Sequence, residues 1–246
     1  MNEPLQITLK RGVKKWLRRQ NWNVRRASRT LHVEQRIQRT NKLALSNFKR
    51  LSGRSGMKVH LGCGPDVRAG WINIDLNTAR SAKPFEESAD GTVYINYDLR
   101  LGLPLENASC GLVYSSHFFE HLEYECGVKL MEDCSRALQL GGKFRIVLPD
   151  MKSLFQAYLK KDAEFFKLLD PLLAPEIEPA TATLIDYINY GVYQFGEHKY
   201  IYDEEKLIKV LGSVGFSQVG ASSFQPEVDV NTPTRKKYSF YVEAAK

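Results

Sequence analysis

The sequence lacks any long apolar run. Its 246 residues include no stretch close to the roughly 18 consecutive apolar residues that a membrane-spanning helix requires. The first residues also lack the apolar segment that is typical of a secretory signal. We therefore expect neither a spanning helix nor a leader of that kind.

Cysteine is scarce as well. The chain has four cysteines, Cys63, Cys110, Cys126 and Cys134, and no two of them have the C-x-x-C spacing. This pattern indicates neither a disulfide framework nor a cysteine-based zinc site. It favours a reducing, cytoplasmic setting.

Acidic residues are almost absent from the first 56 residues. This segment holds 15 Lys and Arg against only Glu3 and Glu34, a net charge of +13, whereas residues 57–246 hold 20 basic and 26 acidic residues, a net charge of −6. The charge changes at residues 52–56, Ser-Gly-Arg-Ser-Gly, a composition that is typical of linkers. We predict a basic helical N-terminal arm with a linker at 1–56 and one domain at 57–246.

The arm has the pattern of a basic amphipathic helix. Leu5, Leu9, Val13 and Trp16 recur at helical spacing, with lysines and arginines between them. One interpretation is contact of residues 1–52 with an anionic membrane surface. A second is docking to an acidic protein or to another copy of this chain. Binding to nucleic-acid phosphates is a third and less favoured interpretation, because the domain itself is acidic. The oligomeric state stays open.

The domain alternates strand-like and helix-like segments. We predict strands at 58–61, 71–75, 93–97, 111–115, 143–148, 216–221 and 238–243, and helices at about 124–139, 151–169, 180–193 and 203–214. Such alternation predicts a mostly parallel α/β sheet with helices on both faces. The last two strands are close in sequence and are expected to form an antiparallel hairpin at the edge of a seven-stranded, Rossmann-like sheet.

Two glycines and an acidic residue point to a nucleoside ligand. Gly62 and Gly64 follow the first strand, and Asp75 ends the second, where a carboxylate can accept hydrogen bonds from ribose hydroxyls. A dinucleotide fingerprint needs a further small residue where this chain has Val67. The spacing therefore favours a ligand with a ribose and without a pyrophosphate.

Five ordered motifs give the chain a family resemblance. They read V-H-L-G-C-G-P, G-W-I-N-I-D, Y-D-L-R-L-G-L-P-L, S-C-G-L-V-Y-S-S-H-F-F-E-H-L and A-L-Q-L-G-G-K-F-R-I-V-L-P-D. Together they resemble class I S-adenosylmethionine-dependent methyltransferases, and more narrowly the type-11-like bacterial group associated with surface polysaccharide biosynthesis. The resemblance runs from about residue 58 to 149 and resumes at 196–203 and 214–216.

This resemblance implies that S-adenosyl-L-methionine is the cofactor. Gly62, Cys63 and Gly64 are expected to meet its methionine part, and Asp75 its ribose. Asp98 and Leu99 are expected to meet the adenine, and Ser115 and Ser116 the transferred methyl. One position departs from the pattern, because many relatives carry an acidic residue where this chain has His60.

The segment His117-Phe-Phe-Glu120-His121 also fits the H-x-x-E-H signature of inverted zinc peptidases. It follows a strand, at the place where the resembling methyltransferases carry E-H-L. We therefore expect no metal site here. Two interpretations stay open: a structural one, in which His121 packs or caps beneath the cofactor loop, and a functional one, in which His117 binds substrate or removes a proton.

The methyl group of a sulfonium is already activated, so the enzyme has mainly to hold the acceptor in line with it. An alcohol acceptor also needs a base, which would contribute roughly 10²–10⁴-fold. The candidate bases are His117, Asp150 and His198, although His198 has the alternative of being a turn residue before Asp203. We expect O-methylation of a glycan, a glycolipid or a small hydroxylated metabolite. The alternatives are a non-catalytic adapter recruited by the arm and a nucleic-acid methyltransferase.

An insert of residues 151–202 separates the fifth predicted strand from the helix after Asp203. It is rich in phenylalanine and tyrosine. These side chains have two interpretations, the core of packed helices or a substrate-shaping lid that stacks on sugar rings.

Overall fold

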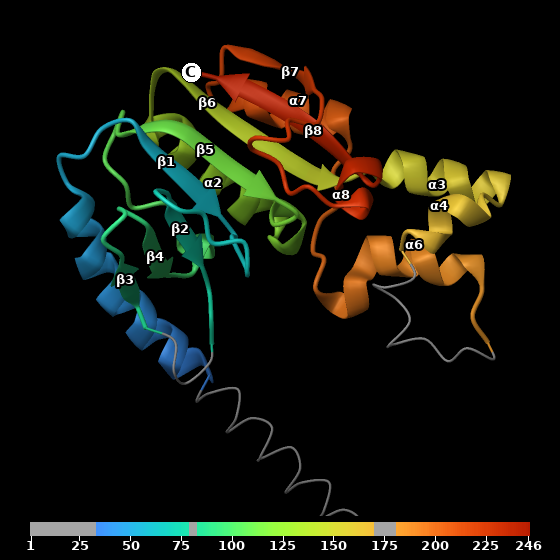
Figure 1. Ribbon diagram of the computed structural model, residues 1–246, viewed down its shortest axis with the longest axis horizontal. Helices are drawn as coiled ribbons and strands as arrows, with labels where there is room; N and C mark the ends of the chain where they lie inside the picture. Colours follow the sequence, from blue (N-terminus) through green and yellow to red (C-terminus); the bar gives the residue numbers. More distant parts are fainter. Residues whose placement is uncertain (1–32, 79–82, 170–180) are drawn as a thin grey trace, which may run out of the picture.

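A computed structural model describes residues 33–78, 83–169 and 181–246, and its centre is an eight-stranded sheet (Figure 1). The strand order is β3-β4-β2-β1-β5-β6-β8-β7. The strands are β1 (Met57–Leu61), β2 (Ile72–Asp75), β3 (Phe85–Glu87), β4 (Val93–Asn96), β5 (Cys110–Ser116), β6 (Leu138–Pro149), β7 (Gln218–Ser222) and β8 (Ser239–Ala245).

The sheet is Rossmann-like and mostly parallel, as predicted. Strands β4, β2, β1, β5 and β6 pair in parallel. The last two strands form the expected antiparallel pair, and β8 lies between β6 and the edge strand β7. The predicted number of seven strands was wrong, because β3 adds an antiparallel strand at the opposite edge. This strand has only three residues, Phe-Glu-Glu, too few to produce a periodic pattern.

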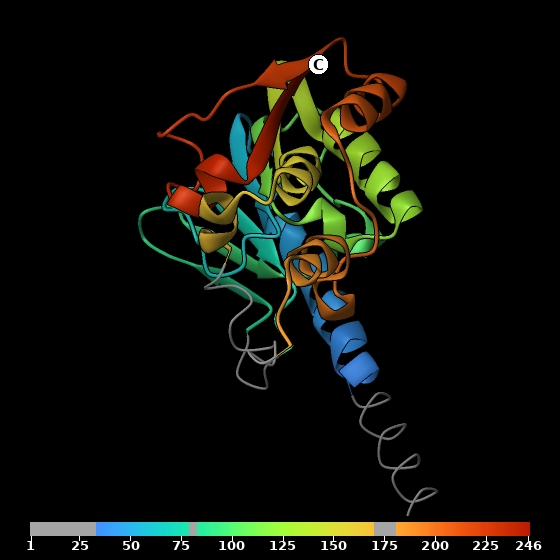
Figure 2. The ribbon, with the colours of Figure 1, turned by 90° about the vertical axis from the view of Figure 1, so that its right-hand side faces the viewer.

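The helices pack around this sheet, and Figure 2 shows α2 and α7 on the same side of it. Side chains of both helices share the main core with β6, including Leu130 of α2 and Leu211 of α7. The helices are α2 (Tyr124–Ala137), α3 (Met151–Lys160), α4 (Ala163–Lys167), α6 (Leu184–Tyr193), α7 (Glu204–Ser213) and α8 (Pro233–Lys237), and the 3-10 turns are η1 (Lys49–Leu51), η2 (Leu99–Leu101), η3 (Phe119–His121) and η4 (Gln194–Gly196).

Several predicted helix ends differ from the structure: the helix expected at 180–193 begins at Leu184, and two others end early for a clear local reason. The helix expected to reach residue 139 ends at Ala137, because Leu138 already has the extended backbone that opens β6. The helix expected at 151–169 is broken into α3 and α4 at Lys161, which has a left-handed φ of 54°. The Asp162 side chain then caps α4 by accepting a hydrogen bond from the Phe165 backbone.

The insert has a small core of its own, beyond the end of β6 (Figure 1). Met151 and Leu154 of α3 pack with Phe165 and Phe166 of α4 and with Tyr238. A separate core means that the insert and the sheet meet along one boundary, which lies at the carboxyl ends of the strands.

The described part of the basic segment packs against the domain. Residues 33–48 are helical, and their Ala44 and Phe48 are buried in the main core. The ring of Phe48 lies edge-on to that of Tyr97, with centroids 5.2 Å apart. Ser52 and the backbone of Gly53 donate hydrogen bonds to Glu106. The change of charge at residues 52–56 is therefore not a boundary of packing.

The remaining features of the arm, from Leu5 to Trp16, lie outside the described residues. Within the described ranges, the search for a helix both long and apolar enough to cross a bilayer found none.

Candidate functional site

The carboxyl ends of the parallel strands meet at one edge of the sheet. Leu61 of β1 lies beside Ile74 of β2 and Ser115 of β5, and Asp75 lies beside Asn96 of β4. This register places the residues that follow β1, β2, β4 and β5 next to one another, as the sequence predicts. Open α/β sheets bind their ligands at this edge.

The loop after β1 depends on its two glycines. Gly62 and Gly64 have φ values of 62° and 49°, in the left-handed region that other residues avoid. A Cβ on Gly62 would lie 2.2 Å from Cγ of Phe118, so the glycine lets that ring pack directly on the backbone. A Cβ on Gly64 would have no described atom within 4 Å. The backbone of Gly64 therefore faces open space at the sheet edge.

Asp75 holds this loop from the neighbouring strand. Its Oδ2 accepts a hydrogen bond of 2.7 Å from the Gly64 backbone. An ionised carboxylate can accept about four hydrogen bonds. Asp75 can therefore position the loop and still accept from a ligand.

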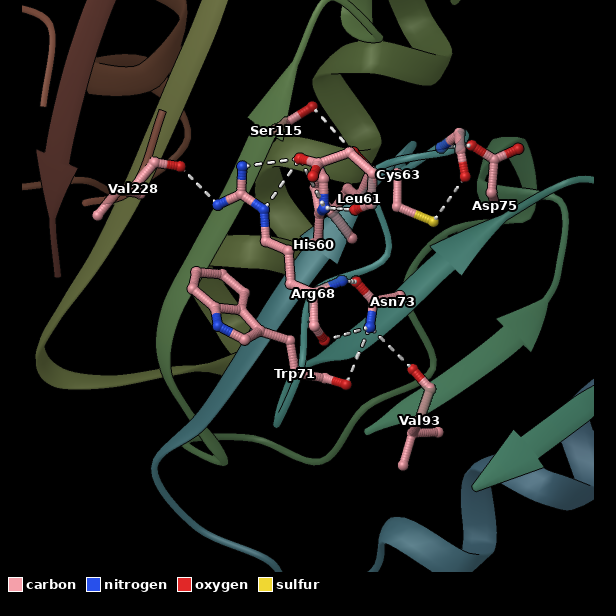
Figure 3. Close-up of polar contacts among 12 residues, drawn as sticks. His60, Leu61, Cys63, Arg68, Trp71, Asn73, Asp75, Val93, Ser115 and Val228 are labelled. Carbon is pink, nitrogen blue, oxygen red and sulfur yellow. Dashed lines mark hydrogen bonds and ion pairs between the residues drawn. The ribbon is translucent and has the colours of Figure 1, made fainter. Parts of the chain in front are cut away.

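An arginine beneath the loop fixes its far end (Figure 3). Arg68 donates to the Asp66 carboxylate and, at 2.6 Å, to the Val228 carbonyl. Its own backbone amide donates to Oδ1 of the fully buried Asn73. Sequence reasoning missed this support, because Val228 is distant in the chain and Asn73 reads as an ordinary strand residue.

His60, the departure from the family pattern, supports the same loop. It is 1% exposed, and its Nδ1 lies 3.1 Å from the Asp66 carbonyl. Burial, assisted by the charge of Arg68, lowers the pKa of His60 to about 4. The ring is therefore neutral at physiological pH and donates its Nδ1 proton to that carbonyl.

Cys63 has a packing role in this structure. Its side chain is 3% exposed, and its thiol donates to the Gly64 carbonyl at 3.6 Å. Burial, with the charge of Asp75, raises the pKa of the thiol to about 12. Cys63 is therefore no thiolate nucleophile.

Asp98 lies after β4, and an arginine already occupies its carboxylate. Arg100 donates to both oxygens, with a shortest distance of 2.6 Å, and its backbone amide donates to the same carboxylate. The Asp98 amide donates to Oδ1 of Asn41 in the N-terminal helix. A ligand amine at this point would share the carboxylate with Arg100. Leu99 is buried in the main core.

The end of β5 contributes the predicted serines. Oγ of Ser115 donates to the Leu61 carbonyl at 3.3 Å, so this hydroxyl ties β5 to β1. Oγ of Ser116 is buried and has no hydrogen-bond partner among the described residues. The hydroxyl of Tyr114, two residues earlier on the same strand, is a polar neighbour of this group.

His117 follows in a conformation that is unusual for its residue type. Its φ is 49°, and its backbone amide donates to the Val147 carbonyl. Nε2 lies 2.8 Å from Oγ of Ser239, and Nδ1 lies 3.8 Å from Oε1 of Glu120. A non-glycine residue held in this region stores strain, which is common at functional sites.

Glu120 is a buried carboxyl group that the sequence analysis did not select. Its side chain is 2% exposed, and neither carboxylate oxygen has a hydrogen-bond partner within the described residues. Burial raises the pKa of Glu120 to about 8. Its backbone carbonyl accepts hydrogen bonds from the amides of Lys199 and Tyr200.

That backbone contact brings His198 beside His121. Their ring centroids lie 4.9 Å apart, and burial is the main cause that lowers the pKa of each. One ligand atom from each of Glu120, His121 and His198 lies within 4.8 Å of the others. His198 is far in sequence from the adjacent Glu120 and His121, so spacing alone could not reveal this cluster.

Asp150, the remaining candidate base, caps a helix. Its carboxylate accepts hydrogen bonds from the backbone amide and the hydroxyl of Ser153 at the start of α3. Nδ1 of His198, in contrast, lies 2.8 Å from the Gly191 carbonyl, which leaves Nε2 available.

The aromatic residues of the insert differ in their exposure. Phe165, Phe166 and Tyr202 are buried, whereas Tyr193 and Phe195 are each 60% exposed. An open groove of about 590 Å³ also lies between α3 and residues 200–206.

Comparisons with known proteins concern the fold. No protein-family model matches the sequence, and no curated protein matches it. A solved S-adenosylmethionine-dependent methyltransferase from Archaeoglobus fulgidus is 16% identical, with 83% of this chain and 94% of that chain covered and a TM-score of 0.45. One from Mesorhizobium loti is 18% identical, with 82% and 96% covered and a TM-score of 0.44. One from Thermotoga maritima, described as a possible histamine N-methyltransferase, is 13% identical, with 85% and 91% covered and a TM-score of 0.44.

Proposed function

We propose that this chain is an S-adenosylmethionine-dependent methyltransferase that acts on a hydroxyl group. The observation that carries the proposal is the loop at Gly62–Gly64, which is closed by Asp75 at the carboxyl edge of the sheet. The loop exposes bare backbone beside a carboxylate with free acceptor capacity, and a ribose and an amino-acid moiety need both.

The cofactor fits the groups around this loop. Its methionine part lies against Gly62, Cys63 and Gly64, and its ribose hydroxyls donate to Asp75. The open space at Gly64 supports this placement.

The adenine lies next to Asp98 and Leu99. The ion pair with Arg100 means that the Asp98 carboxylate is held in place before the adenine arrives. It also predicts that Asp98 contributes less to affinity than Asp75 does, because the adenine amine has to share an acceptor that is already engaged.

When bound, S-adenosylmethionine supplies an activated methyl group. The chain has to hold the acceptor oxygen in line with it and remove a proton. His117 lies directly after the Ser115-Ser116 floor and is our first choice as base, with His198 as the second. Asp150 is a weaker choice, because its carboxylate already caps α3.

The proposed acceptor is a hydroxyl of a glycan, a glycolipid or a small hydroxylated metabolite, as in surface polysaccharide biosynthesis. The exposed rings of Tyr193 and Phe195 support it, because aromatic faces pack well against sugar rings. A nucleic-acid acceptor is less favoured, since residues 57–246 carry a net charge of −6. A non-catalytic adapter is the second candidate from another class.

We further propose that the protein works in the cytoplasm and that its basic segment brings it to an anionic membrane surface. Residues 1–32 hold nine lysines and arginines against Glu3. Each such charge near an anionic leaflet contributes about 1 kcal/mol.

The experiment is a transfer assay with radiolabelled S-adenosylmethionine against sugars, glycolipids and RNA. We expect label in a hydroxylated sugar or lipid with the full chain, and none with the Asp75→Ala variant. Label in RNA alone would exclude the proposed acceptor. Cofactor binding with no transfer to any acceptor class would favour the adapter.

A further inference from the structure

A buried carboxyl group without a hydrogen bond from the described residues, that of Glu120, lies between two histidines from different parts of the chain, and its nearest titratable neighbour in the motif is His117, whose Nδ1 lies 3.8 Å from Oε1. Glu120 is 2% exposed, and no described residue donates a hydrogen bond to either of its oxygens. A buried carboxylate is costly unless it is paired or binds a metal. One atom each of Glu120, His121 and His198 lies within 4.8 Å of the other two, which is close enough for a single small cation to reach all three.

The backbone holds these three side chains in place. Nδ1 of His198 donates to the Gly191 carbonyl at 2.8 Å, which leaves the Nε2 lone pair free. Metal-binding histidines are typically oriented in this way, with the second ring nitrogen donating to a carbonyl or a carboxylate. The amides of Lys199 and Tyr200 donate to the Glu120 carbonyl and so fix the segment that carries His198 to the turn that carries Glu120 and His121.

We propose that Glu120, His121 and His198 form a site for a divalent transition metal of the zinc type. Two imidazole nitrogens and one carboxylate oxygen are the ligands of three-residue sites that leave a coordination position open. Mg²⁺ and Ca²⁺ prefer oxygen ligands, so the donor set selects against them. This assignment replaces the expectation of no metal, which rested on the motif alone.

The site differs from the one that H-x-x-E-H suggests. In the peptidase arrangement both histidines of the motif bind the metal and the glutamate acts as base. Here His117 lies outside the 3-10 turn of Phe119–His121, in a left-handed conformation, and its Nε2 contacts Ser239. The glutamate takes a ligand position, and His198 takes the place of His117.

The site lies close to the proposed cofactor loop. Glu120 and His121 belong to the turn that follows β5, and the carboxyl end of β5 pairs with that of β1, from which the loop starts. A metal with an open position would bind the acceptor hydroxyl there and lower its pKa, so that its proton leaves more readily before methyl transfer. This role rests on the proposed function, whereas the metal site itself does not.

The test is metal binding to the full chain after removal of bound metal with a chelator. Zn²⁺ is titrated by calorimetry, and Co²⁺ is titrated by its visible absorption, which is strong in sites of low coordination number. We expect about one equivalent of either ion per chain and no competition by Mg²⁺. Loss of an outer-shell partner typically lowers metal affinity by roughly 10- to 100-fold. Glu120→Gln and His198→Ala each remove a direct ligand and should lower the affinity for Zn²⁺ by more than that.

His117→Gln is the matched control, because it removes a histidine of the same motif that lies 3.8 Å from Glu120 but is not a ligand of the proposed site. It should keep its metal. Circular dichroism shows which variants fold. His198 is part-buried in a loop, so His198→Ala remains informative if Glu120→Gln does not fold.

Absence of Zn²⁺ and Co²⁺ binding to the full chain would overturn the proposal, and so would binding that persists in the folded ligand variants. Loss of metal in His117→Gln with retention in His198→Ala would assign the metal to the motif pair instead. Cofactor binding is measured on the same samples. Failure of metal binding with intact cofactor binding contradicts this inference alone, and the reverse contradicts the proposed function alone.

Discussion

Protonation of His60 should make the stability of the protein fall steeply in mild acid. The ring is 1% exposed, and burial lowers its pKa from the ordinary 6.5 to about 4. Because the folded state holds the neutral form, the unfolded chain binds a proton first as the pH falls. Each pKa unit corresponds to about 1.4 kcal/mol, so His60 should cost about 3 kcal/mol between pH 8 and pH 4, and about 2 kcal/mol of this is lost by pH 5.

The variant that tests this value is His60→Asn. Its amide nitrogen can take the place of Nδ1 and donate to the Asp66 carbonyl, but it does not titrate. The smaller side chain should lower stability by a similar amount at every pH. His121 and His198, whose pKa values are also lowered, contribute equally in both proteins.

The measurement is urea unfolding of both proteins at several pH values from 8 to 4.5. We expect the free energy of unfolding of the wild type to fall by about 2.5 kcal/mol more than that of His60→Asn over this range. Equal losses in the two proteins would refute a buried neutral His60 beneath the cofactor loop.

Three further predictions concern the loop, the sheet and the arm. Gly62→Ala should lower the free energy of unfolding by about 2–4 kcal/mol, because it adds backbone strain and a clash with Phe118. Gly64→Ala should lower it by only about 1–2 kcal/mol, because it adds strain alone. Equal losses of the two variants in urea unfolding would contradict this difference. Asp229→Asn should cost about 2–3 kcal/mol in the same assay, because the buried Arg145 loses its charged bonds to Asp229 and keeps only Glu243, at 2.9 Å, as a carboxylate partner, and a loss below about 1 kcal/mol would show that the pair contributes little. Deletion of residues 1–32, which spares the packed helix at 33–48, should abolish sedimentation with anionic liposomes and leave cofactor affinity unchanged; continued sedimentation would place the membrane contact in the domain.

Local sequence patterns were sufficient for the part of the site that lies within single motifs. The loop at Gly62–Gly64 and the carboxylate of Asp75 come from strand ends, and parallel strands bring such ends to one edge whatever the details of packing. For the same reason the alternation of strands and helices predicted the sheet, and Asp203 caps α7 as its sequence position suggests.

Features that depend on tertiary contacts were not predictable. Arg68 finds its acceptor at Val228, and Glu120 meets His198, only because separate loops return to the same place. Composition was also misleading for residues 33–48, because a few buried side chains such as Phe48 hold a helix whose exposed faces are basic. A sum of charges cannot distinguish a free arm from a packed helix with a basic outer face.

The central claim is that the edge around Gly64 and Asp75 binds S-adenosylmethionine, and calorimetric titration of the full chain with this cofactor tests it most directly. Asp75→Asn can still accept the Gly64 hydrogen bond and serves as the control for loop structure. Asp75→Ala removes both the Gly64 contact and the proposed contact with the ribose hydroxyls. We predict binding to the wild type, intermediate affinity for Asp75→Asn, and a loss of about 2–4 kcal/mol for Asp75→Ala, which is a roughly 30- to 1,000-fold weaker affinity. No binding to the wild-type chain, or equal affinity for all three proteins, would contradict the account.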